Sequence, residues 1–300
     1  MKALDHYLPY RRLKNLRYRF RRHASAQLRR IPAAFIKDYT LPDFLIIGAM
    51  KSGTTALYDL LQQHPGICAA DTKEVGFLDR PEFYRFGESW YGSYFPLPRK
   101  MRHLSAQLGY RALTGEASPA MIRHSYAIKA ARHVPNARLI VILRNPVERA
   151  YSHYQHVSRS ITPDALSFAQ ALAAEQDRIR HDLEMNQLDP ERAGSNLTRL
   201  GYMERGKYIE HIEQWLRYFP RSQMKILSYD QFSRQPVTVA DEIVRYLDLP
   251  AHEFNAPRTL NRGHSSAPMD ADSRRFLTEF YRPYNRRLFE FLDDDWGWPS

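Results

Sequence analysis

The sequence is poor in several features, and each absence narrows the class of protein. Its 300 residues include one cysteine, Cys68, so no disulfide can form within the chain. No apolar run approaches the ~20 residues that a membrane-spanning helix needs. The N-terminus also lacks the short apolar core of a secretory signal. We therefore expect a protein of the reducing cytoplasm.

Acidic residues are fewer than basic residues, and most of the excess positive charge lies in one segment of the chain. Lysine and arginine total 44 against 33 aspartates and glutamates, which gives a net charge of +11. Residues 1–40 hold eleven of these basic residues against Asp5 and Asp38, a local charge of +9. The remainder is nearly balanced, so we divide the chain into a basic N-terminal extension, 1–40, and one domain, 41–300.

The basic extension is open to two interpretations. Leu13, Leu16 and Phe20 have the spacing of one helical face, which suits a basic amphipathic helix in peripheral contact with a membrane, an acidic polymer or a neighbouring protomer. A solvated, disordered extension fits the composition equally well. An alternative function is non-enzymatic binding of nucleic acid or another anionic polymer. This function would explain the basic extension but not the phosphate-binding motifs described below, so we expect no nucleic-acid partner.

The segment Phe44–Pro65 organises the rest of the chain. It begins with an apolar run, Phe44–Ile47, that is typical of a strand buried on both faces, and Gly48 ends the run. From Thr54 the leucines recur at helical spacing. A strand, a glycine-containing loop and a helix start form a phosphate-binding unit, because the backbone amides at the helix start point towards the ligand.

The spacing within this loop differs from that of nucleotide triphosphatases. In their loop, G-x-x-x-x-G-K-[ST], the lysine follows the second glycine. Gly48 and Gly53 have the same separation, but Thr54 occupies the lysine position and the basic residue is Lys51. The loop therefore predicts a site for a phosphate compound. A P-loop kinase acting on a small molecule stays as an alternative, although it would need a magnesium ligand and the usual lysine.

Strands and helices alternate after this unit. Apolar periodicity predicts strands at 110–114, 139–143 and 224–229, and helices at 127–132, 164–184, 208–219 and 237–247. A final helix from Asp272 is expected to be interrupted at Pro283. This alternation predicts an α/β fold with a P-loop-type, mainly parallel sheet covered by helices on both faces.

Two polar segments are predicted to follow the carboxyl ends of strands, where open α/β sheets bind ligands. Gly115–Pro119 follows the strand at 110–114, and Arg144 follows the strand at 139–143. Asn145 and the proline after it mark a helix start, which places Ser152 two turns into that helix. Because a guanidinium can hold a phosphate with its planar fork, Arg144 predicts a second anion site.

Six segments carry a family resemblance. They are KSGTT at 51–55, KEVGFLD at 73–79, TGEASP at 114–119, RNPVERAYSHY at 144–154, WLRYFP at 215–220 and FYRPYN at 280–285. Together they resemble the carbohydrate sulfotransferases that use 3′-phosphoadenosine 5′-phosphosulfate (PAPS), in particular the heparan sulfate type. The resemblance extends from about residue 42 to 298 and implies the sulfotransferase fold.

The resemblance implies roles for individual residues. The 5′-phosphosulfate of PAPS would be held by Lys51, Ser52, Gly53, Thr54 and Thr55. The 3′-phosphate would be held by Arg144 and Ser152. A loop that covers the cofactor in the family corresponds to Arg262, Gly263 and His264, where the family's lysine and arginine are replaced by arginine and histidine.

The same resemblance assigns catalysis to Glu74 as general base, with Lys51 stabilising the leaving group. A positioned carboxylate typically contributes about 10²–10⁴ in rate. Sulfuryl transfer needs in-line placement and neutralisation of charge, and the sequence has no clear acidic metal site, so no metal is expected. The implied acceptor is a hydroxyl or amine of a sugar or glycan. Two departures, Gly76 for a histidine and Ala117 for a lysine, weaken the case for heparan itself.

Overall fold

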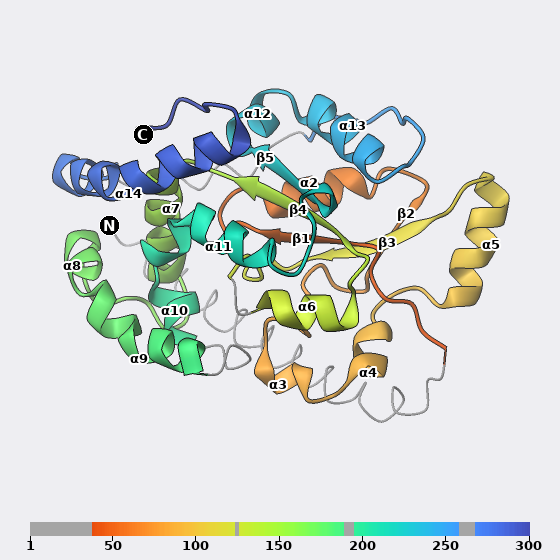
Figure 1. Cartoon of the computed structure of the whole chain (residues 1–300), viewed down its shortest axis with the longest axis horizontal. Helices are drawn as coiled ribbons and strands as arrows, with labels where there is room; N and C mark the ends of the chain where they lie inside the picture. The colour runs from red at the N-terminus through yellow and green to blue at the C-terminus, as the bar shows by residue number, and fades with distance from the viewer. Residues whose placement is uncertain (1–37, 124–125, 189–194, 258–267) are drawn as a thin grey trace, which may run out of the picture.

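The computed structural model describes residues 38–123, 126–188, 195–257 and 268–300. Within them a parallel five-stranded sheet has the order β2-β3-β1-β4-β5 (Figure 1). The strands are β1 Phe44–Gly48, β2 Ile67–Ala69, β3 Leu113–Ala117, β4 Arg138–Leu143 and β5 Met224–Ser228. Phe44 pairs with Gly115 on one side and Arg138 on the other. The predicted α/β class with a parallel sheet is confirmed.

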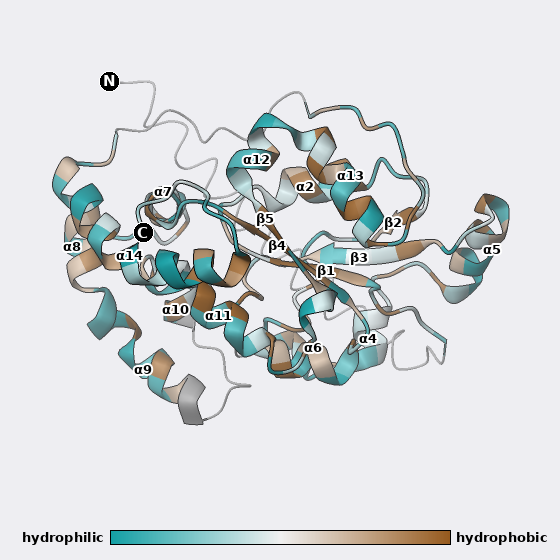
Figure 2. Cartoon of the chain, turned by 45° about the horizontal axis from the view of Figure 1, so that its top comes forward, coloured by the Kyte–Doolittle hydropathy of each residue, from teal (hydrophilic) through white to brown (hydrophobic). Residues whose placement is uncertain are grey.

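Helices cover both faces of the sheet (Figure 1). One face carries α2 (Thr54–Leu61), α12 (Tyr229–Arg234) and α13 (Pro236–Tyr246). The other carries α3 (Pro81–Tyr84), α4 (Glu88–Gly92), α6 (Ala127–His133) and α11 (Tyr208–Trp215). Phe44 and Ile46 pack into the first core, Leu45 and Ile47 into the second. This two-sided burial explains the unbroken apolar run, which Figure 2 shows as brown strands at the centre.

A third cluster of helices packs beside the sheet. It is formed by α7 (Pro146–Ser158), α8 (Phe168–Ala173), α9 (Glu175–Leu188), α10 (Ser195–Leu200) and α14 (Ala271–Leu292). The remaining described helices are α5 (Pro98–Leu108) and the 3₁₀ turns η2 (Glu204–Gly206) and η3 (Arg221–Gln223). None of the helices among the described residues is both long and apolar enough to cross a membrane.

Two helix predictions were wrong in detail. The helix predicted at 164–184 starts later, because Ser167 begins α8 with a capping box that includes Gln170, and it is divided into α8 and α9 at Ala174. The helix α14 continues through Pro283. Pro283 is exposed, so the helix loses one backbone hydrogen bond on its solvent side while its buried side stays packed.

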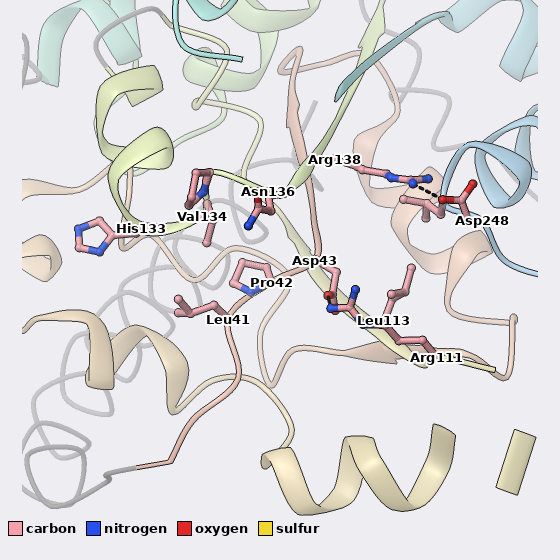
Figure 3. A pocket seen from close by; sticks show the side chains of 13 residues that line it. Leu41, Pro42, Asp43, Arg111, Leu113, His133, Val134, Asn136, Arg138 and Asp248 are labelled. Carbon is pink, nitrogen blue, oxygen red and sulfur yellow. Dashed lines mark hydrogen bonds and ion pairs between the residues drawn. The ribbon is translucent and has the colours of Figure 1, made fainter. Parts of the chain in front are cut away.

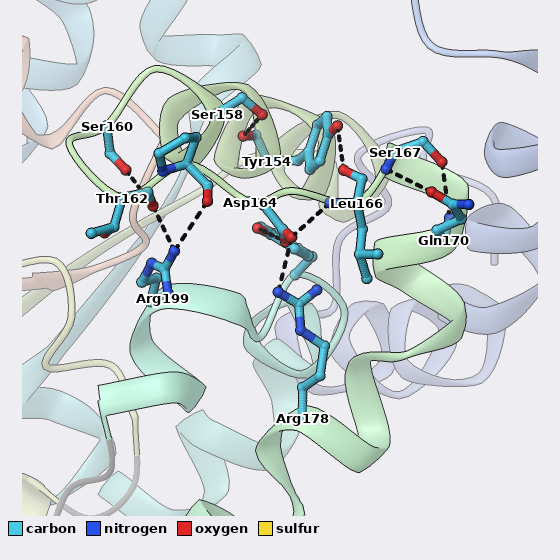
Figure 4. A network of polar contacts seen from close by, with 12 residues as sticks. Tyr154, Ser158, Ser160, Thr162, Asp164, Leu166, Ser167, Gln170, Arg178 and Arg199 are labelled. Carbon is cyan, nitrogen blue, oxygen red and sulfur yellow. Dashed lines mark hydrogen bonds and ion pairs between the residues drawn. The ribbon is translucent and has the colours of Figure 1, made fainter.

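A polar network fixes the chain that follows α7 (Figure 4). The carboxylate of Asp164 accepts hydrogen bonds from Arg178 at 2.9 Å and from the Tyr202 hydroxyl at 2.8 Å. Arg199 donates to the carbonyl of Thr162 at 2.5 Å. The Tyr154 hydroxyl, on α7 itself, donates to the carbonyl of Leu166 at 2.9 Å. These bonds hold the end of α7 against α9 and α10, and α7 carries predicted site residues.

A buried carboxyl at the start of α9 should make stability depend on pH. Glu175 is fully buried and accepts hydrogen bonds from the amides of Met203 and Glu204. Burial raises its pKa from 4.5 to about 7, although these amides and Arg149 oppose the shift. The folded protein therefore keeps a proton on Glu175 that the unfolded chain has released above pH 4.5. This side chain lowers the free energy of unfolding as the pH rises from 4.5 to 7.

We expect Glu175→Gln to remove this dependence. The free energy of unfolding of the wild type should fall relative to that of the variant by roughly 3 kcal/mol between pH 4.5 and 7, since one pKa unit corresponds to about 1.4 kcal/mol. Urea denaturation across this range measures the difference. The exposed Glu253, changed to glutamine, is the matched control and should give a profile parallel to the wild type. Parallel profiles for Glu175→Gln would contradict the assignment.

Candidate active site at the carboxyl ends of the strands

The loop between β1 and α2 has a constrained backbone. Lys51 and Gly53 both have positive φ, 71° and 87°. A β-carbon at Gly53 would lie 3.1 Å from the Tyr229 ring, so glycine suits both the conformation and the space. The Ala49 amide donates to the Ile142 carbonyl at 2.7 Å, which ties the loop to β4. A non-glycine residue such as Lys51 in this conformation is uncommon, and such residues cluster at ligand-binding sites.

The start of α2 offers backbone donors. The Leu57 amide donates to the Gly53 carbonyl at 3.0 Å, and no side chain caps the helix. The amides of Thr54 and Thr55 precede this bond and so have no acceptor within the helix. Ser52 is fully buried; its hydroxyl lies near Tyr208 but completes no well-formed hydrogen bond within the described residues. These donors suit the oxygens of a phosphate or sulfate.

Positive charge accumulates around Lys51. Partial burial lowers the pKa of its ammonium group, and the neighbouring cations Arg144 and Arg159 lower it further. Like charges held together raise the free energy of the charged state, and a bound anion relieves this repulsion. A cluster of cations, among them a lysine whose pKa is lowered, beside backbone donors at a helix start is what an anion-binding site requires.

Arg144 lies directly after β4, as predicted. Its guanidinium donates to the Lys51 carbonyl at 3.4 Å and lies 5.3 Å from the centroid of the Tyr229 ring. The Tyr208 hydroxyl donates to the Arg144 carbonyl at 2.9 Å. Asn145 then caps α7, also as predicted. The structure thus brings together two predicted anion-binding segments that are 93 residues apart in the sequence.

Glu74 lies in the segment that follows β2 and runs beside the end of β3. The Ala117 amide donates to the Lys73 carbonyl at 2.8 Å, and the Val75 amide donates to the Glu116 carboxylate at 3.0 Å. The Glu74 carboxylate is half-exposed and lies 2.9 Å from the Lys73 ammonium. A partly exposed carboxylate at the same sheet edge as Lys51 can reach a substrate proton.

The end of β3 was predicted wrongly. The strand was expected at 110–114 with Gly115–Pro119 beyond it, whereas it covers Leu113–Ala117 and includes Glu116. Apolar periodicity excludes a glutamate from a buried strand, but here three hydrogen-bond donors satisfy its carboxylate. Ser118 and the residues after it still follow the carboxyl end of a strand.

Helix α7 presents one residue that the sequence reasoning missed. His156 lies four residues after Ser152 and therefore on the same face of the helix. Its side chain is exposed to solvent. Desolvation by the surrounding chain lowers its pKa, Lys51 and Arg159 lower it further, and Glu74 opposes the shift. His156 is thus near both the loop lysine and the candidate base. The i, i+4 spacing from Ser152 was the signal in the sequence that could have identified it.

Other predicted site residues are less constrained. Ser152 is half-buried in α7, and its role in binding stays a prediction. In the loop, Thr54 is buried and Thr55 is exposed. Arg262, Gly263 and His264 lie outside the described residues, as do residues 1–37 of the basic extension.

A hollow of about 490 Å³ lies at the amino ends of the strands, on the side of the sheet away from the Lys51 loop (Figure 3). It is lined by residues at the amino ends of β1, β3 and β4, including Asp43, Leu113 and Arg138. None of the predicted site residues lines it. Ligands of open parallel sheets bind at the carboxyl ends, so we place the active site at the Lys51 loop. The fold and this site together define an α/β protein with a phosphate-binding loop at the carboxyl ends of its strands.

Comparison with known proteins identifies the family. Residues 41–266 match the sulfotransferase domain model. The human bifunctional heparan sulfate N-deacetylase/N-sulfotransferase 3 is 33% identical over 282 residues, covering 84% of this chain and 30% of the relative. The Dictyostelium discoideum membrane-associated sulfotransferase kil1 is 26% identical over 325 residues, covering 87% and 67%. A crystal structure of a sulfotransferase from Alicyclobacillus acidocaldarius has a TM-score of 0.63 at 28% identity, covering 85% and 97%.

The chain therefore belongs to the sulfotransferase family, has the sulfotransferase fold and is an enzyme of that class. It spans about 30% of the length of the N-deacetylase/N-sulfotransferase relatives. Membership of this family favours the sulfotransferase interpretation of the loop over the P-loop kinase. It agrees with the position of the basic residue, which is Lys51 and not a lysine directly after Gly53.

Proposed function

We propose that the chain transfers a sulfuryl group from PAPS to a hydroxyl or amine of a glycan acceptor. The contact between Arg144 and the Lys51 loop carries this proposal. It joins two anion-binding elements at neighbouring strand ends, which suits a donor that bears phosphate groups at both its 5′ and 3′ positions. The names of the relatives, heparan sulfate N-sulfotransferases, support a glycan as acceptor.

The residues of the site fit this donor. The amides of Thr54 and Thr55, the buried Ser52 hydroxyl and the Lys51 ammonium would hold the 5′-phosphosulfate. Arg144 and Ser152 would hold the 3′-phosphate, and Arg262, Gly263 and His264 would cover the cofactor. When bound, PAPS supplies the sulfuryl group.

The chain's own groups account for the remaining chemistry. Glu74 takes the proton from the acceptor, because a carboxylate within reach of the acceptor can act as general base. The Lys51 ammonium donates a hydrogen bond to the oxygen on which negative charge develops. His156 lies near both groups, and its imidazole would offer a further polar contact to the bound donor or acceptor. Among the described residues, no group of three side chains suited to metal binding is found.

Incubation of the protein with ³⁵S-labelled PAPS and heparan sulfate stripped of its N-sulfates tests the proposal. This polymer offers both amines and hydroxyls, and mass spectrometry of the labelled product separates N- from O-sulfation. A panel of neutral glycans and small alcohols completes the experiment. Transfer from labelled ATP with magnesium, and none from PAPS to any acceptor, would contradict the proposal and favour a kinase.

The same assay tests the role of the basic extension, which we propose serves peripheral contact with a membrane or an acidic polymer. A chain without residues 1–37 should keep turnover on a small acceptor. If removal of the extension abolishes all activity, the protein instead acts through its basic segment alone.

Arg144→Ala should weaken binding of adenosine 3′,5′-bisphosphate by about 10- to 100-fold, since a hydrogen bond to a charged group contributes about 1.5–3 kcal/mol. Binding of adenosine 5′-phosphate, which lacks the 3′ group, should change little. Isothermal titration calorimetry measures both, and the exposed Arg234 changed to alanine is the control. Equal weakening of the two ligands would remove Arg144 from the 3′-phosphate site.

A further inference from the structure

Glu116 is a buried carboxylate to which the proposed mechanism gives no role. Its side chain is 0% exposed and lies near the end of β3. It accepts hydrogen bonds from the Tyr91 hydroxyl at 2.5 Å, the Ser118 hydroxyl at 2.6 Å and the Val75 amide at 3.0 Å. Burying a carboxylate is costly, so three donors aimed at it indicate that the arrangement serves a purpose beyond packing.

The bond to Val75 reaches the segment that carries Glu74. Val75 directly follows Glu74, and its amide is held by Glu116. Lys73 directly precedes Glu74, and its carbonyl accepts a hydrogen bond from the Ala117 amide at 2.8 Å. Two consecutive residues of β3 therefore hold the backbone on both sides of Glu74. One of the two bonds is made by a side chain and can be changed by substitution.

We propose that Glu116 is a positioning residue for Glu74, because it fixes the backbone of residues 73–75 and with it the direction of the Glu74 carboxylate. This inference rests on the proposed role of Glu74 as general base. Glu116 does not contact the reacting atoms. A general base that is displaced by about 1 Å can lose about 100-fold in rate, so a residue that holds its backbone influences turnover directly.

The groups around Glu116 make this arrangement sensitive to pH. Burial raises its pKa to about 7; the Ser118, Tyr91 and Val75 donors oppose the shift, and the nearby Asp79 adds to it. Tyr91 from α4 and Tyr58 from α2 also face it, and Glu116 contributes to the raised pKa of each. Protonation removes one acceptor from the three-donor arrangement, so the hold on Val75 weakens as the pH falls below 7.

The test compares Glu116→Gln, Glu74→Gln and the double variant, with Glu175→Gln as control. Glu175 is matched in burial and in its raised pKa, and it binds backbone amides of another segment. Transfer of ³⁵S from PAPS to heparan sulfate stripped of its N-sulfates gives kcat. We expect Glu116→Gln to lower kcat by about 10- to 100-fold without changing the affinity for adenosine 3′,5′-bisphosphate.

Two further readouts separate positioning from a general structural role. The double variant should lose no more activity than Glu74→Gln alone, because Glu116 acts through Glu74. The rise of wild-type kcat through pH 7 should be absent from Glu116→Gln and present in Glu175→Gln. Additive losses, or a pH profile that Glu116→Gln leaves unchanged, would overturn the inference.

The outcomes also distinguish this inference from the proposed function. Full turnover by Glu74→Gln would reject Glu74 as base. Loss of turnover by Glu74→Gln with normal turnover by Glu116→Gln would reject only the positioning role. If the polymer is not an acceptor, amide hydrogen exchange decides: residues 71–78 should exchange faster in Glu116→Gln and not in Glu175→Gln. Unchanged exchange there would overturn the inference.

Discussion

Changing Glu74 to glutamine is expected to lower kcat by about 10²–10⁴-fold while leaving the affinity for adenosine 3′,5′-bisphosphate unchanged. Glutamine has nearly the same size as glutamate, but it cannot take a proton from the hydroxyl or amine that receives the sulfuryl group. The proposed donor site is built from the Lys51 loop and Arg144, so its affinity should not depend on the Glu74 carboxylate. Steady-state transfer from labelled PAPS and a calorimetric titration measure the two quantities.

Glu82 provides the matched control for this experiment. It is an exposed glutamate in α3, eight residues further along the chain, and Glu82→Gln should retain wild-type turnover. A purified Glu74→Gln enzyme with near-normal transfer would exclude Glu74 as the base and would leave His156 as the next group to test at the site.

Removing the Lys51 ammonium should have the second large effect. Lys51→Ala is expected to lower kcat by about 10²–10³-fold, the size measured when one preorganised donor is taken from a site of developing charge. Because burial and the cations Arg144 and Arg159 already lower its pKa, Lys51 should release its proton at lower pH than an ordinary lysine. The alkaline limb of the wild-type kcat/KM profile for PAPS, which reports the free enzyme, should therefore begin early.

Lys51→Arg tests this alkaline limb, because arginine stays charged throughout the accessible range. Whatever activity this variant retains should not decline where the wild type does. Lys100, which is exposed on α5, is the control, and Lys100→Ala should match the wild type in both rate and profile. A Lys51→Ala enzyme that only binds the donor less tightly, with an unchanged kcat, would move Lys51 from catalysis to binding.

Two positions, Gly76 and Ala117, depart from the pattern that the sequence resemblance led us to expect of the heparan type. Gly76 has φ 85°, which a histidine rarely adopts, and a β-carbon there would lie 2.8 Å from the Arg80 side chain, which would have to move. Ala117 is fully buried at the end of β3, which leaves no open path for a lysine side chain. These local constraints favour an acceptor that is contacted differently at this point, which is why the glycan panel belongs in the functional assay.

Strong local signals made most of the donor site predictable. Phe44–Ile47 is apolar at every position because the strand is buried on both faces, so its existence and type could be inferred without a partner strand. The break at Gly48, the helical spacing after Thr54 and the Asn145 cap are equally local. Each depends on neighbouring residues alone. The structure confirms the strand, the helix after Thr54 and the Asn145 cap, although β1 includes Gly48 instead of ending before it.

The sequence by itself therefore determined the parallel α/β class and the two segments that meet where Arg144 contacts the Lys51 loop, at the proposed donor site. Only the tertiary structure showed that Glu116 lies inside a strand and holds the segment of Glu74, and that His156 lies near Lys51. The physical reason is that a buried carboxylate is tolerated only where distant donors satisfy it, here Tyr91 and Val75, and local periodicity carries no information about such partners. What a side chain faces across the fold is decided by packing between elements.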